Sequence, residues 1–523
     1  MRKVDYEGFP MSWRASVDEL NHRRSLVARM GAPEKVERQR NAGKLNVRER
    51  IDALLDQGSF REIGSITGRA TYDAAGHLVD LASSNFIFGR GRIASRPVVI
   101  AADDFTVRGG AADGSTGGKM IASEQMACEL RMPLVRLIDG GGGSIRTVEE
   151  LGRTYVPANP AWDWVVRNLE TVPVVSMVLG SIGGFASARA VASHYSVMVR
   201  DTTHMFIAGP AVVTRTGATY TKDELGSPEL HARAGAVDDI AENEADAMAR
   251  AARFLSYLPG SVYEVPPRLP CNDPVDRCDE RLIDIVPTDR RKVYKMREIL
   301  AKTLDEGSFF ETGPHFGRSA ITGLARLDGF PVAVLASDPY HYGGAWTADT
   351  AQKVKRFVDM AETFHLPVVH FVDIPGFLIG LEAEQAATIR HGASVLSAIY
   401  QATVPWCSIL VRKVFGVAGA AHSNASRFRY RYAWPSGDWG SIPLEGGIEA
   451  AYRSDIAASP DPKAALEEIT ARLEAVRSPF RTSEAFGVEE IIDPRQTRPL
   501  LCEFAGHAQR LLRPEPSRVQ YRP

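Results

Sequence analysis

The feature that most constrains the fold is a fifteen-residue stretch that occurs twice in the chain. Residues 171–185 read TVPVVSMVLGSIGGF and residues 403–417 read TVPWCSILVRKVFGV. Both copies begin with Thr-Val-Pro, continue through a mostly apolar, β-branched run, and place a glycine at the same distance from their start, Gly184 in one and Gly416 in the other. Such a run is typical of a strand that is buried on both faces of a sheet. The repeated strand therefore predicts two related halves.

Further identities extend the repeat along the chain. The segment DQGSFREIG (56–64) returns as DEGSFFETG (305–313). Beyond it the offset settles at 234 residues, as between Asp139 and Asp373. The matching positions at this offset are Pro97, Asp104, Gly109, Gly110, Lys119 and Pro133 with Pro331, Asp338, Gly343, Gly344, Lys353 and Pro367. So many identities in one order indicate an internal duplication.

Alternating strand and helix patterns in each half predict an α/β fold. A chain of 523 residues is also too long for a single hydrophobic core. We expect two domains, residues 1–265 and 280–523, joined by a proline-rich linker within residues 259–287.

The two glycine turns also suggest chemistry. A buried strand that ends in glycine and leads into a helix presents backbone N–H groups without partners, and such groups stabilise negative charge on oxygen. A glycine after a strand is more often a plain turn residue, and it is the duplication that favours an oxyanion hole. The four glycines after Asp139, which include the candidate substrate-binding residues Gly141, Gly142 and Gly143, suit a backbone that another group approaches closely. A flexible linker is the alternative.

Composition and short motifs exclude several classes of protein. The net charge of −2 gives no basic excess for nucleic acid, and no apolar run is long enough to span a membrane. The first residues, MRKVDYEGFPMSW, lack the apolar core of a secretory signal. Five scattered cysteines without C-x-x-C spacing favour neither disulfides nor a metal site, which fits a cytoplasmic protein. Gly89-Arg-Gly91 lacks the other glycines of a dinucleotide-binding loop and is interpreted as a hairpin.

With both halves aligned, the chain resembles the carboxyltransferase (β) subunit of biotin-dependent acyl-CoA carboxylases, of the propionyl-CoA carboxylase type. The resemblance covers nearly the whole chain and rests on GKLNVRERIDALLDQGSF (43–60), FVDIPGFLIG (371–380), IRHGA (389–393) and RKVFGVAGA (412–420). It implies two duplicated crotonase-like domains, each a spiral of ββα units. It also implies active sites between the N-domain of one subunit and the C-domain of another, usually within a homohexamer.

The resemblance implies an activity and its partners. In this family CO₂ moves from carboxybiotin on a partner protein to the α-carbon, or vinylogous carbon, of a coenzyme A thioester. The chain has no Ala-Met-Lys-Met biotin-attachment signature and no ATP-binding carboxylase domain. A biotinylated α subunit with biotin carboxylase and carrier domains is therefore the expected partner.

By position, the family's backbone donors fall on Gly184 and Phe185 in the first half and on Val417 and Ala418 in the second, with Gly416 in the turn. The family usually has Gly-Gly-Ala at both places, whereas this chain has Gly-Phe-Ala and Gly-Val-Ala. A backbone N–H survives any substitution other than proline, so both donor sets are expected to persist with bulkier walls.

The resemblance also implies which positions lie near the substrates. The family's Phe-Leu-Pro-Gly near biotin is Phe-Leu-Ile-Gly here, from Phe377 to Gly380. Ala420 matches a position that helps set the size of the acyl group. A small residue there leaves room that a longer chain fills with a gain of about 0.8 kcal/mol per buried methylene, so propionyl or larger groups are expected over acetyl.

Three alternatives stay open. One is the carboxyltransferase subunit of a biotin-dependent acyl-CoA decarboxylase, which runs the same half-reaction backwards. Another is a crotonase-type lyase or hydrolase without biotin, although residues 185–189 after Gly184 offer no Glu or Asp. The third is a catalytically silent assembly subunit.

Overall fold

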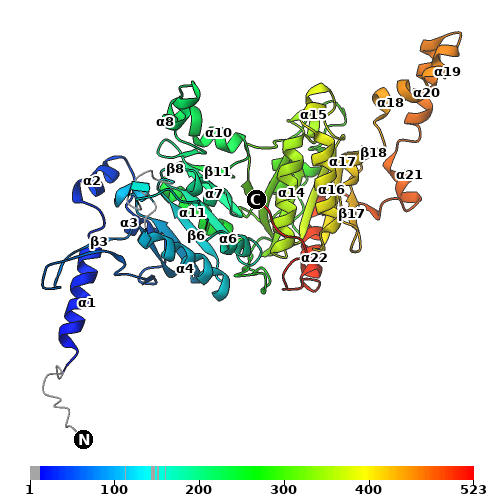
Figure 1. The fold of residues 1–523 in the computed structure, drawn as a ribbon. Coiled ribbons are helices and arrows are strands. Elements are labelled where there is room, and N and C mark those ends of the chain that lie inside the picture. The colour runs from blue at the N-terminus through cyan, green and yellow to red at the C-terminus, as the bar shows by residue number, and fades with distance from the viewer. Residues whose placement is uncertain (1–11, 112–113, 143–147, 150–151, 160) are drawn as a thin grey trace, which may run out of the picture.

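Two large sheets lie side by side in the computed structural model, one from each half of the chain (Figure 1). The structure describes residues 12–111, 114–142, 148–149, 152–159 and 161–523. Gly143, one of the predicted site residues, lies outside this range.

The first sheet has seven strands in the order β1-β4-β5-β6-β7-β9-β11. Strands β1, β4 and β5 are antiparallel and those from β5 onward run parallel. Every residue of β6, β7 and β9 is buried, which is why their sequences are mostly apolar and do not alternate, with Arg136, Ser176 and Ser196 as the buried polar exceptions. The strands are β1 (Arg61–Ile63), β4 (Phe86–Ile93), β5 (Arg96–Asp103), β6 (Leu134–Ile138), β7 (Val174–Val178), β9 (Tyr195–Val199) and β11 (Asp239–Ala241), with the small pairs β2 (Gly68–Tyr72) and β3 (Leu78–Ser83), and β8 (Ser181–Gly183) and β10 (His204–Phe206).

The second sheet repeats this arrangement as β12-β13-β14-β15-β16-β17-β19, with β18 paired to β16. The pairing register repeats as well: Val135 lies opposite Val175 in the first sheet, and Val369 lies opposite Cys407 in the second. The duplicated sequence runs thus form β7 and β16, the fifth strand of each sheet. The strands are β12 (Phe310–Thr312), β13 (Ala320–Leu327), β14 (Phe330–Ser337), β15 (Val368–Ile374), β16 (Trp406–Phe415), β17 (Tyr430–Ala433), β18 (Asp438–Gly440) and β19 (Glu490–Ile491).

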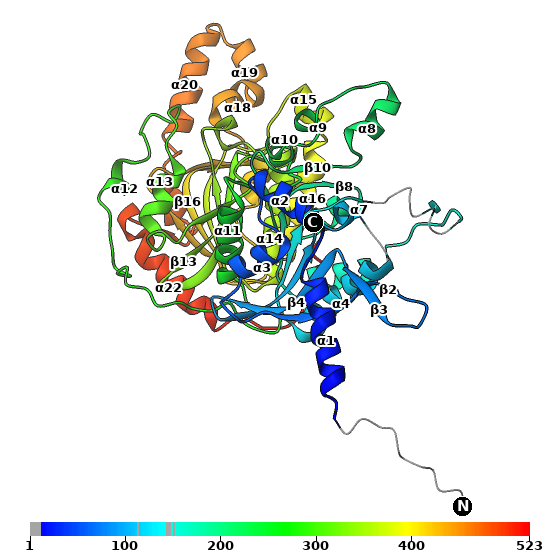
Figure 2. The ribbon, with the colours of Figure 1, turned by 90° about the vertical axis from the view of Figure 1, so that its left-hand side faces the viewer.

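Helices flank both sheets, and two groups of them project from the body in both views (Figures 1 and 2). Helix α1 projects from one end, and α18–α21 project from the other. In the first half the helices are α1 (Arg14–Val27), α2 (Pro33–Asn41), α3 (Val47–Leu54), α4 (Gly114–Leu130), α6 (Trp162–Leu169), α7 (Phe185–Val191), α8 (Pro210–Val213), α9 (Lys222–Gly226), α10 (Pro228–Arg233) and α11 (Glu244–Tyr257). In the second they are α12 (Arg281–Asp284), α13 (Met296–Thr303), α14 (Ala348–Thr363), α15 (Leu381–Gln385), α16 (Thr388–Gln401), α17 (Gly416–Ala420), α18 (Leu444–Ala451), α19 (Arg453–Ala458), α20 (Pro462–Glu474), α21 (Pro479–Glu484) and α22 (Thr497–Gln509).

The two halves share one hydrophobic cluster. The Tyr195 ring of β9 lies 4.9 Å from Phe254 of its own half and 5.5 Å from Phe310 of the other, measured between ring centroids. Tyr521, near the end of the chain, adds a second link. Its ring lies 4.5 Å from His194, and its hydroxyl accepts a hydrogen bond of 2.9 Å from Arg356 of α14.

One expectation from the sequence differs from the structure. The proline-rich segment before residue 287 is not a bare linker, because Leu282, Ile285 and Val286 are buried in the core of the second half. The hairpin expected around Gly89 and Gly91 is present, since β4 pairs antiparallel with β5; both glycines lie within β4, and Ala94 and Ser95, both with positive φ, make the turn. A side chain at Gly89 would collide with the backbone of β1.

Candidate active site

In the first half the predicted turn joins β8 to helix α7 through Gly184. Its φ of 57° lies in the left-handed region that glycine adopts without strain. The Gly184 N–H donates a hydrogen bond of 3.1 Å to the carbonyl of Phe206 in β10. The N–H of Phe185, the first residue of α7, has no acceptor within the helix. Of the two predicted donors, the Gly184 N–H is therefore already bonded in this structure, whereas that of Phe185 has no partner within α7.

The glycine-rich loop after β6 lies directly against this turn. A β-carbon on Gly142 would lie 2.7 Å from the carbonyl oxygen of Gly183 and 3.7 Å from the Cα of Gly184. Gly141, its neighbour, is exposed and has open space around its Cα. The loop was expected to be approached closely by another group. In the structure that group is the backbone of the turn, which approaches the loop at Gly142.

The second half repeats the arrangement at β16 and α17. Gly416 has a φ of 61°, Val417 is half exposed, and Ala418 is fully buried. The N–H groups of the first turn of α17 have no acceptors within the helix, as in α7. Gly376, which follows β15, lies beside this turn, since its β-carbon would be 4.0 Å from the carbonyl oxygen of Phe415.

Gly376 is a residue that the motif reasoning did not select. It stands 234 positions after Gly142, which is the same offset that relates Asp139 to Asp373. Applying that offset to the predicted loop residue would have found it. Each half therefore presents the same constellation, a strand–glycine–helix turn with a second glycine laid against it.

Buried ionic clusters anchor both loops from below. Asp139 accepts hydrogen bonds of 2.8 Å from both Lys44 and Arg50, and Arg50 also binds Glu244. Asp373, its duplicate, is bound by Arg412 and by the hydroxyl of Tyr294, both at 2.9 Å. Burial, with the charge of Asp373 adding to it, raises the pKa of Tyr294 well above its ordinary value. These contacts fix the point at which each loop leaves its sheet.

Other predicted residues lie in the second half of the chain. The Phe377 ring lies 6.4 Å from that of Trp346 and fills the space over Gly392. Gly380, with a φ of 114°, precedes α15. Ala420 is exposed at the end of α17. In the first half, the Phe185 ring packs 5.9 Å from Trp162, an aromatic neighbour that the sequence pattern did not indicate.

A serine, a histidine and an aspartate also meet near the first turn. His204 contacts Ser181 at 3.1 Å and Asp223 at 2.9 Å. Ser181 is three residues before Gly184 along an extended strand, which separates the two by about 10 Å. A serine nucleophile must lie next to its oxyanion hole, so this trio braces β8, β10 and α9 and does not favour a hydrolase.

Within the described residues, no group of His, Cys, Asp and Glu has an arrangement that could hold a metal ion. None of the helices described is both long enough and apolar enough to cross a membrane.

The fold and the paired backbone turns define an enzyme of the crotonase-like class. Residues 38–518 match the family model described as the carboxyl transferase domain. The chain therefore belongs to the carboxyl transferase family, and it is a carboxyltransferase. The resemblance and the fold of two duplicated crotonase-like domains are both confirmed.

Individual relatives agree with this assignment. The chain is 33% identical over 500 residues to the carboxyltransferase subunit of propionyl-CoA carboxylase from Haloferax mediterranei, covering 93% of this chain and 95% of that one. It is 32% identical to the 12S subunit of methylmalonyl-CoA carboxyltransferase from Propionibacterium freudenreichii subsp. shermanii, with 92% of each chain covered.

Solved structures agree as well. A transcarboxylase 12S structure, described as a hexamer assembly with methylmalonyl-coenzyme A bound, superposes with a TM-score of 0.87 at 29% identity over 98% of this chain and 99% of that one. A single-chain, multi-domain long-chain acyl-CoA carboxylase gives 0.79 at 25% identity over 96% of this chain and 50% of that chain.

Proposed function

We propose that the chain is the carboxyltransferase subunit of a biotin-dependent acyl-CoA carboxylase, and that its two turns supply the donors for carboxyl transfer. The observation that carries this proposal is the repetition of one backbone constellation, with Gly142 and Gly376 in equivalent places. Two similar donor sets suit a reaction in which two oxygens gain negative charge, one on the thioester and one on the ureido group of biotin.

The residues of the chain act by binding and by charge stabilisation. Biotin, brought by its carrier, supplies the carboxyl group and an acceptor for the substrate's proton. When the α-proton leaves, negative charge develops on the thioester oxygen, and the backbone N–H groups of one turn stabilise it, while those of the other turn are left for the ureido oxygen of biotin. The first turn offers the N–H of Phe185 and the second that of Val417. Each well-placed donor contributes about 3 kcal/mol to the transition state. The rings of Trp162 and Phe185 form an apolar wall beside the first turn.

The partner and the assembly follow from the family. We propose a biotinylated α subunit as the carrier, and a homohexamer as the core, as described for transcarboxylase 12S. A cytoplasmic setting is supported by the five cysteines, which are all free.

The decisive experiment is transfer of a labelled carboxyl group from the biotinylated partner to a panel of acyl-CoAs. We expect transfer to propionyl-CoA or longer chains over acetyl-CoA, with no streptavidin signal on this chain. Replacing Ala420 with isoleucine should shift the preference towards shorter chains. Transfer only from the carboxylated acyl-CoA back to biotin would indicate a decarboxylase, and no transfer in either direction would indicate a silent assembly subunit.

A further inference from the structure

Two pairs of polar residues lie at the same register inside strands that are otherwise mostly apolar. In the first sheet Arg136 of β6 lies opposite Ser176 of β7, and in the second sheet His370 of β15 lies opposite Ser408 of β16. All four residues are fully buried. A polar side chain in the centre of a buried sheet is costly unless it has a hydrogen-bond partner. What each pair binds therefore indicates its role.

In the second half the pair binds the carbonyl of His422, two residues beyond the end of α17. This carbonyl accepts hydrogen bonds from Nδ1 of His370 at 3.1 Å, from the hydroxyl of Ser408 at 2.6 Å and from the indole N–H of Trp406 at 2.9 Å. The His422 ring adds a fourth contact, since its Nδ1 lies 2.8 Å from the carbonyl of Gly419 within α17. Three donors on one main-chain oxygen fix the point at which the chain leaves this helix.

The first half repeats this contact at the end of α7 with a different side chain. Arg136 donates hydrogen bonds of 2.7 Å to the carbonyl of Ala192 and 3.0 Å to that of Arg189. The hydroxyl of Ser176 lies 3.4 Å from the same carbonyl of Arg189. Arg136 and Ser176 stand 234 and 232 positions before their counterparts, the same offsets that relate the two loops and the two repeated strands. Each sheet therefore holds the end of its turn helix through a buried polar pair.

His370 makes this contact as a neutral donor. Burial lowers its pKa to about 3, so the ring is uncharged at neutral pH. Because a carbonyl only accepts hydrogen bonds, the proton of the neutral ring is on Nδ1. The other ring nitrogen, Nε2, is buried and has no hydrogen-bond partner among the described residues. An apolar side chain would avoid the cost of that unpaired nitrogen, so stability alone does not favour a histidine at this position.

The helix that this contact holds is too short to keep its own orientation. Helix α17 has five residues, whereas isolated helices shorter than about 12 residues are marginal in water. Val417 and Ala418, whose N–H groups are the proposed donors, lie five and four residues before the bound carbonyl. We propose that His370, together with Ser408, is a positioning residue for carboxyl transfer, which holds the C-terminal end of α17 so that these N–H groups stay aimed at the oxygen that gains charge. This inference rests on the proposed function.

Two substitutions separate this role from a contribution to stability. His370→Leu fills most of the space of the ring and removes the donor, while two donors to the carbonyl remain. We expect it to be as stable as wild type and to lower kcat about tenfold, with the KM for the acyl-CoA unchanged, because the alignment of the donors acts in the transition state. His370→Asn keeps an N–H at the place of Nδ1 and leaves part of the ring volume empty. We expect it to be less stable than wild type and to keep its kcat. A contribution to stability alone would give the opposite order.

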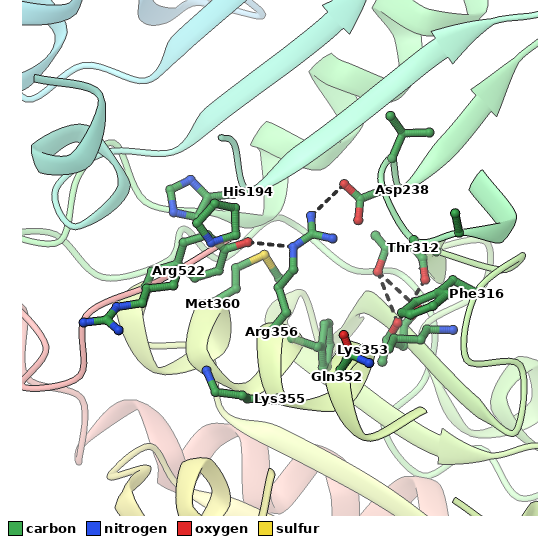
Figure 3. A pocket seen from close by; sticks show the side chains of 18 of the residues that line it. His194, Asp238, Thr312, Phe316, Gln352, Lys353, Lys355, Arg356, Met360 and Arg522 are labelled. Carbon is green, nitrogen blue, oxygen red and sulfur yellow. Dashed lines mark hydrogen bonds and ion pairs between the residues drawn. The ribbon is translucent and has the colours of Figure 1, made fainter. Parts of the chain in front are cut away.

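The measurements are urea unfolding and steady-state carboxyl transfer from the biotinylated partner to propionyl-CoA, with the full-length protein. Thr322→Val is the matched control for the loss of one buried hydrogen bond in the same sheet. The hydroxyl of Thr322 donates to the carbonyl of Thr312 at 2.9 Å, and both residues line the cavity between the two halves (Figure 3). The described lining of that cavity includes no residue of α17. This variant should lose stability and keep its kcat.

Several outcomes overturn the proposal. With an active wild type, they are wild-type kcat in His370→Leu, a raised KM with unchanged kcat in that variant, or an equal fall of kcat in His370→Asn. If His370→Leu fails to fold, Ser408→Ala removes another donor to the same carbonyl and must lower kcat in the same way. A wild type that transfers no carboxyl group overturns the proposed function and this inference together.

Discussion

Glycine is required at position 416 because of the backbone conformation there, and not because a side chain would lack space. Its φ is 61°, while the nearest atom to a β-carbon there, the carbonyl oxygen of Ser441, would be 3.5 Å away. A β-branched residue is strained at this φ, so the turn must re-form and carry the N–H groups of Val417 and Ala418 with it. We expect Gly416→Val to lower the carboxyl-transfer rate about 100-fold, since displacements near 1 Å have that cost.

Gly76 provides the control for strain alone. It has a φ of 85° with open space around it, in the turn between β2 and β3. Gly76→Val should lose stability to a similar degree and keep its transfer rate. Wild-type turnover in a folded Gly416→Val variant would remove Gly416 from the site.

Lys119 makes stability depend on pH. Its pKa falls from 10.5 to about 8 on folding, so between these values the unfolded chain binds more protons and stability rises with pH. The destabilisation caused by burying the Lys119 ammonium is complete below about pH 8 and is absent above pH 10.5. Lys119→Met should therefore be more stable than wild type at pH 7, by up to about 3 kcal/mol. Urea unfolding of both proteins at pH 7.5 and at pH 10 would measure the difference in their free energies of unfolding. If this difference did not shrink at pH 10, the buried ammonium of Lys119 would not be its cause.

The sequence located both turns and named Gly184 and Phe185 as donors in the first, but it did not show that the Gly184 N–H is already bonded. That the first N–H groups of α7 and α17 lack acceptors is a local consequence of where each helix begins. The Gly184 N–H is bonded to the carbonyl of Phe206, and only the pairing of β8 with β10 brings that carbonyl near. The packing of Trp162 on Phe185 depends on α6 in the same way. Contacts between elements that are distant in the sequence, such as these two, cannot be predicted from a short motif.

At the scale of elements, the loop after β6 and the turn before α7 behave as one unit. A β-carbon on Gly142 would press on the carbonyl of Gly183, whereas one on Gly141 meets nothing within 4 Å. We expect Gly142→Ala to lower the transfer rate by about tenfold or more, because the turn must shift to admit the methyl group. Gly141→Ala, its immediate neighbour, should stay near wild type. Steady-state kinetics of the two variants compare them directly, and equal rates would show that the loop does not position the turn.

Elements with a strong pattern were predictable, and those that depend on long-range packing were not. The repeated runs gave β7 and β16 because buried strands read as continuous apolar sequence. The segment around α12 was interpreted as a linker because it has prolines and no periodicity. Leu282 and Ile285 are nevertheless buried, since the second half offers them a core that local sequence does not reveal.

At the scale of the whole molecule, large apolar side chains are exposed beside both turns. Ile207, after β10, is 97% exposed, and Ile379 and Leu381, around the start of α15, are 89% and 74% exposed. Helices α8 and α15 lie on the same side of the molecule (Figure 1). Side chains exposed to this degree are typical of a surface that another subunit covers.

We therefore expect Ile379→Asp to weaken the oligomer and to lower carboxyl transfer with it, as sedimentation velocity and activity would measure. Val79→Asp, on the outer hairpin strand β3 at a residue that is 62% exposed, is the matched control and should change neither. A fully active wild-type monomer would contradict the need for a second subunit.

The shared cluster of Tyr195, Phe254 and Phe310 has a consequence for the order of events on the ribosome. When the first half has emerged, the apolar surface meant for the second half has no partner, and it stays uncovered for tens of seconds at ordinary rates of synthesis. Tyr521 can reach Arg356 only after nearly the whole chain has been made. The nascent chain is thus most prone to aggregation midway through translation, and chaperone demand should peak there rather than at its end.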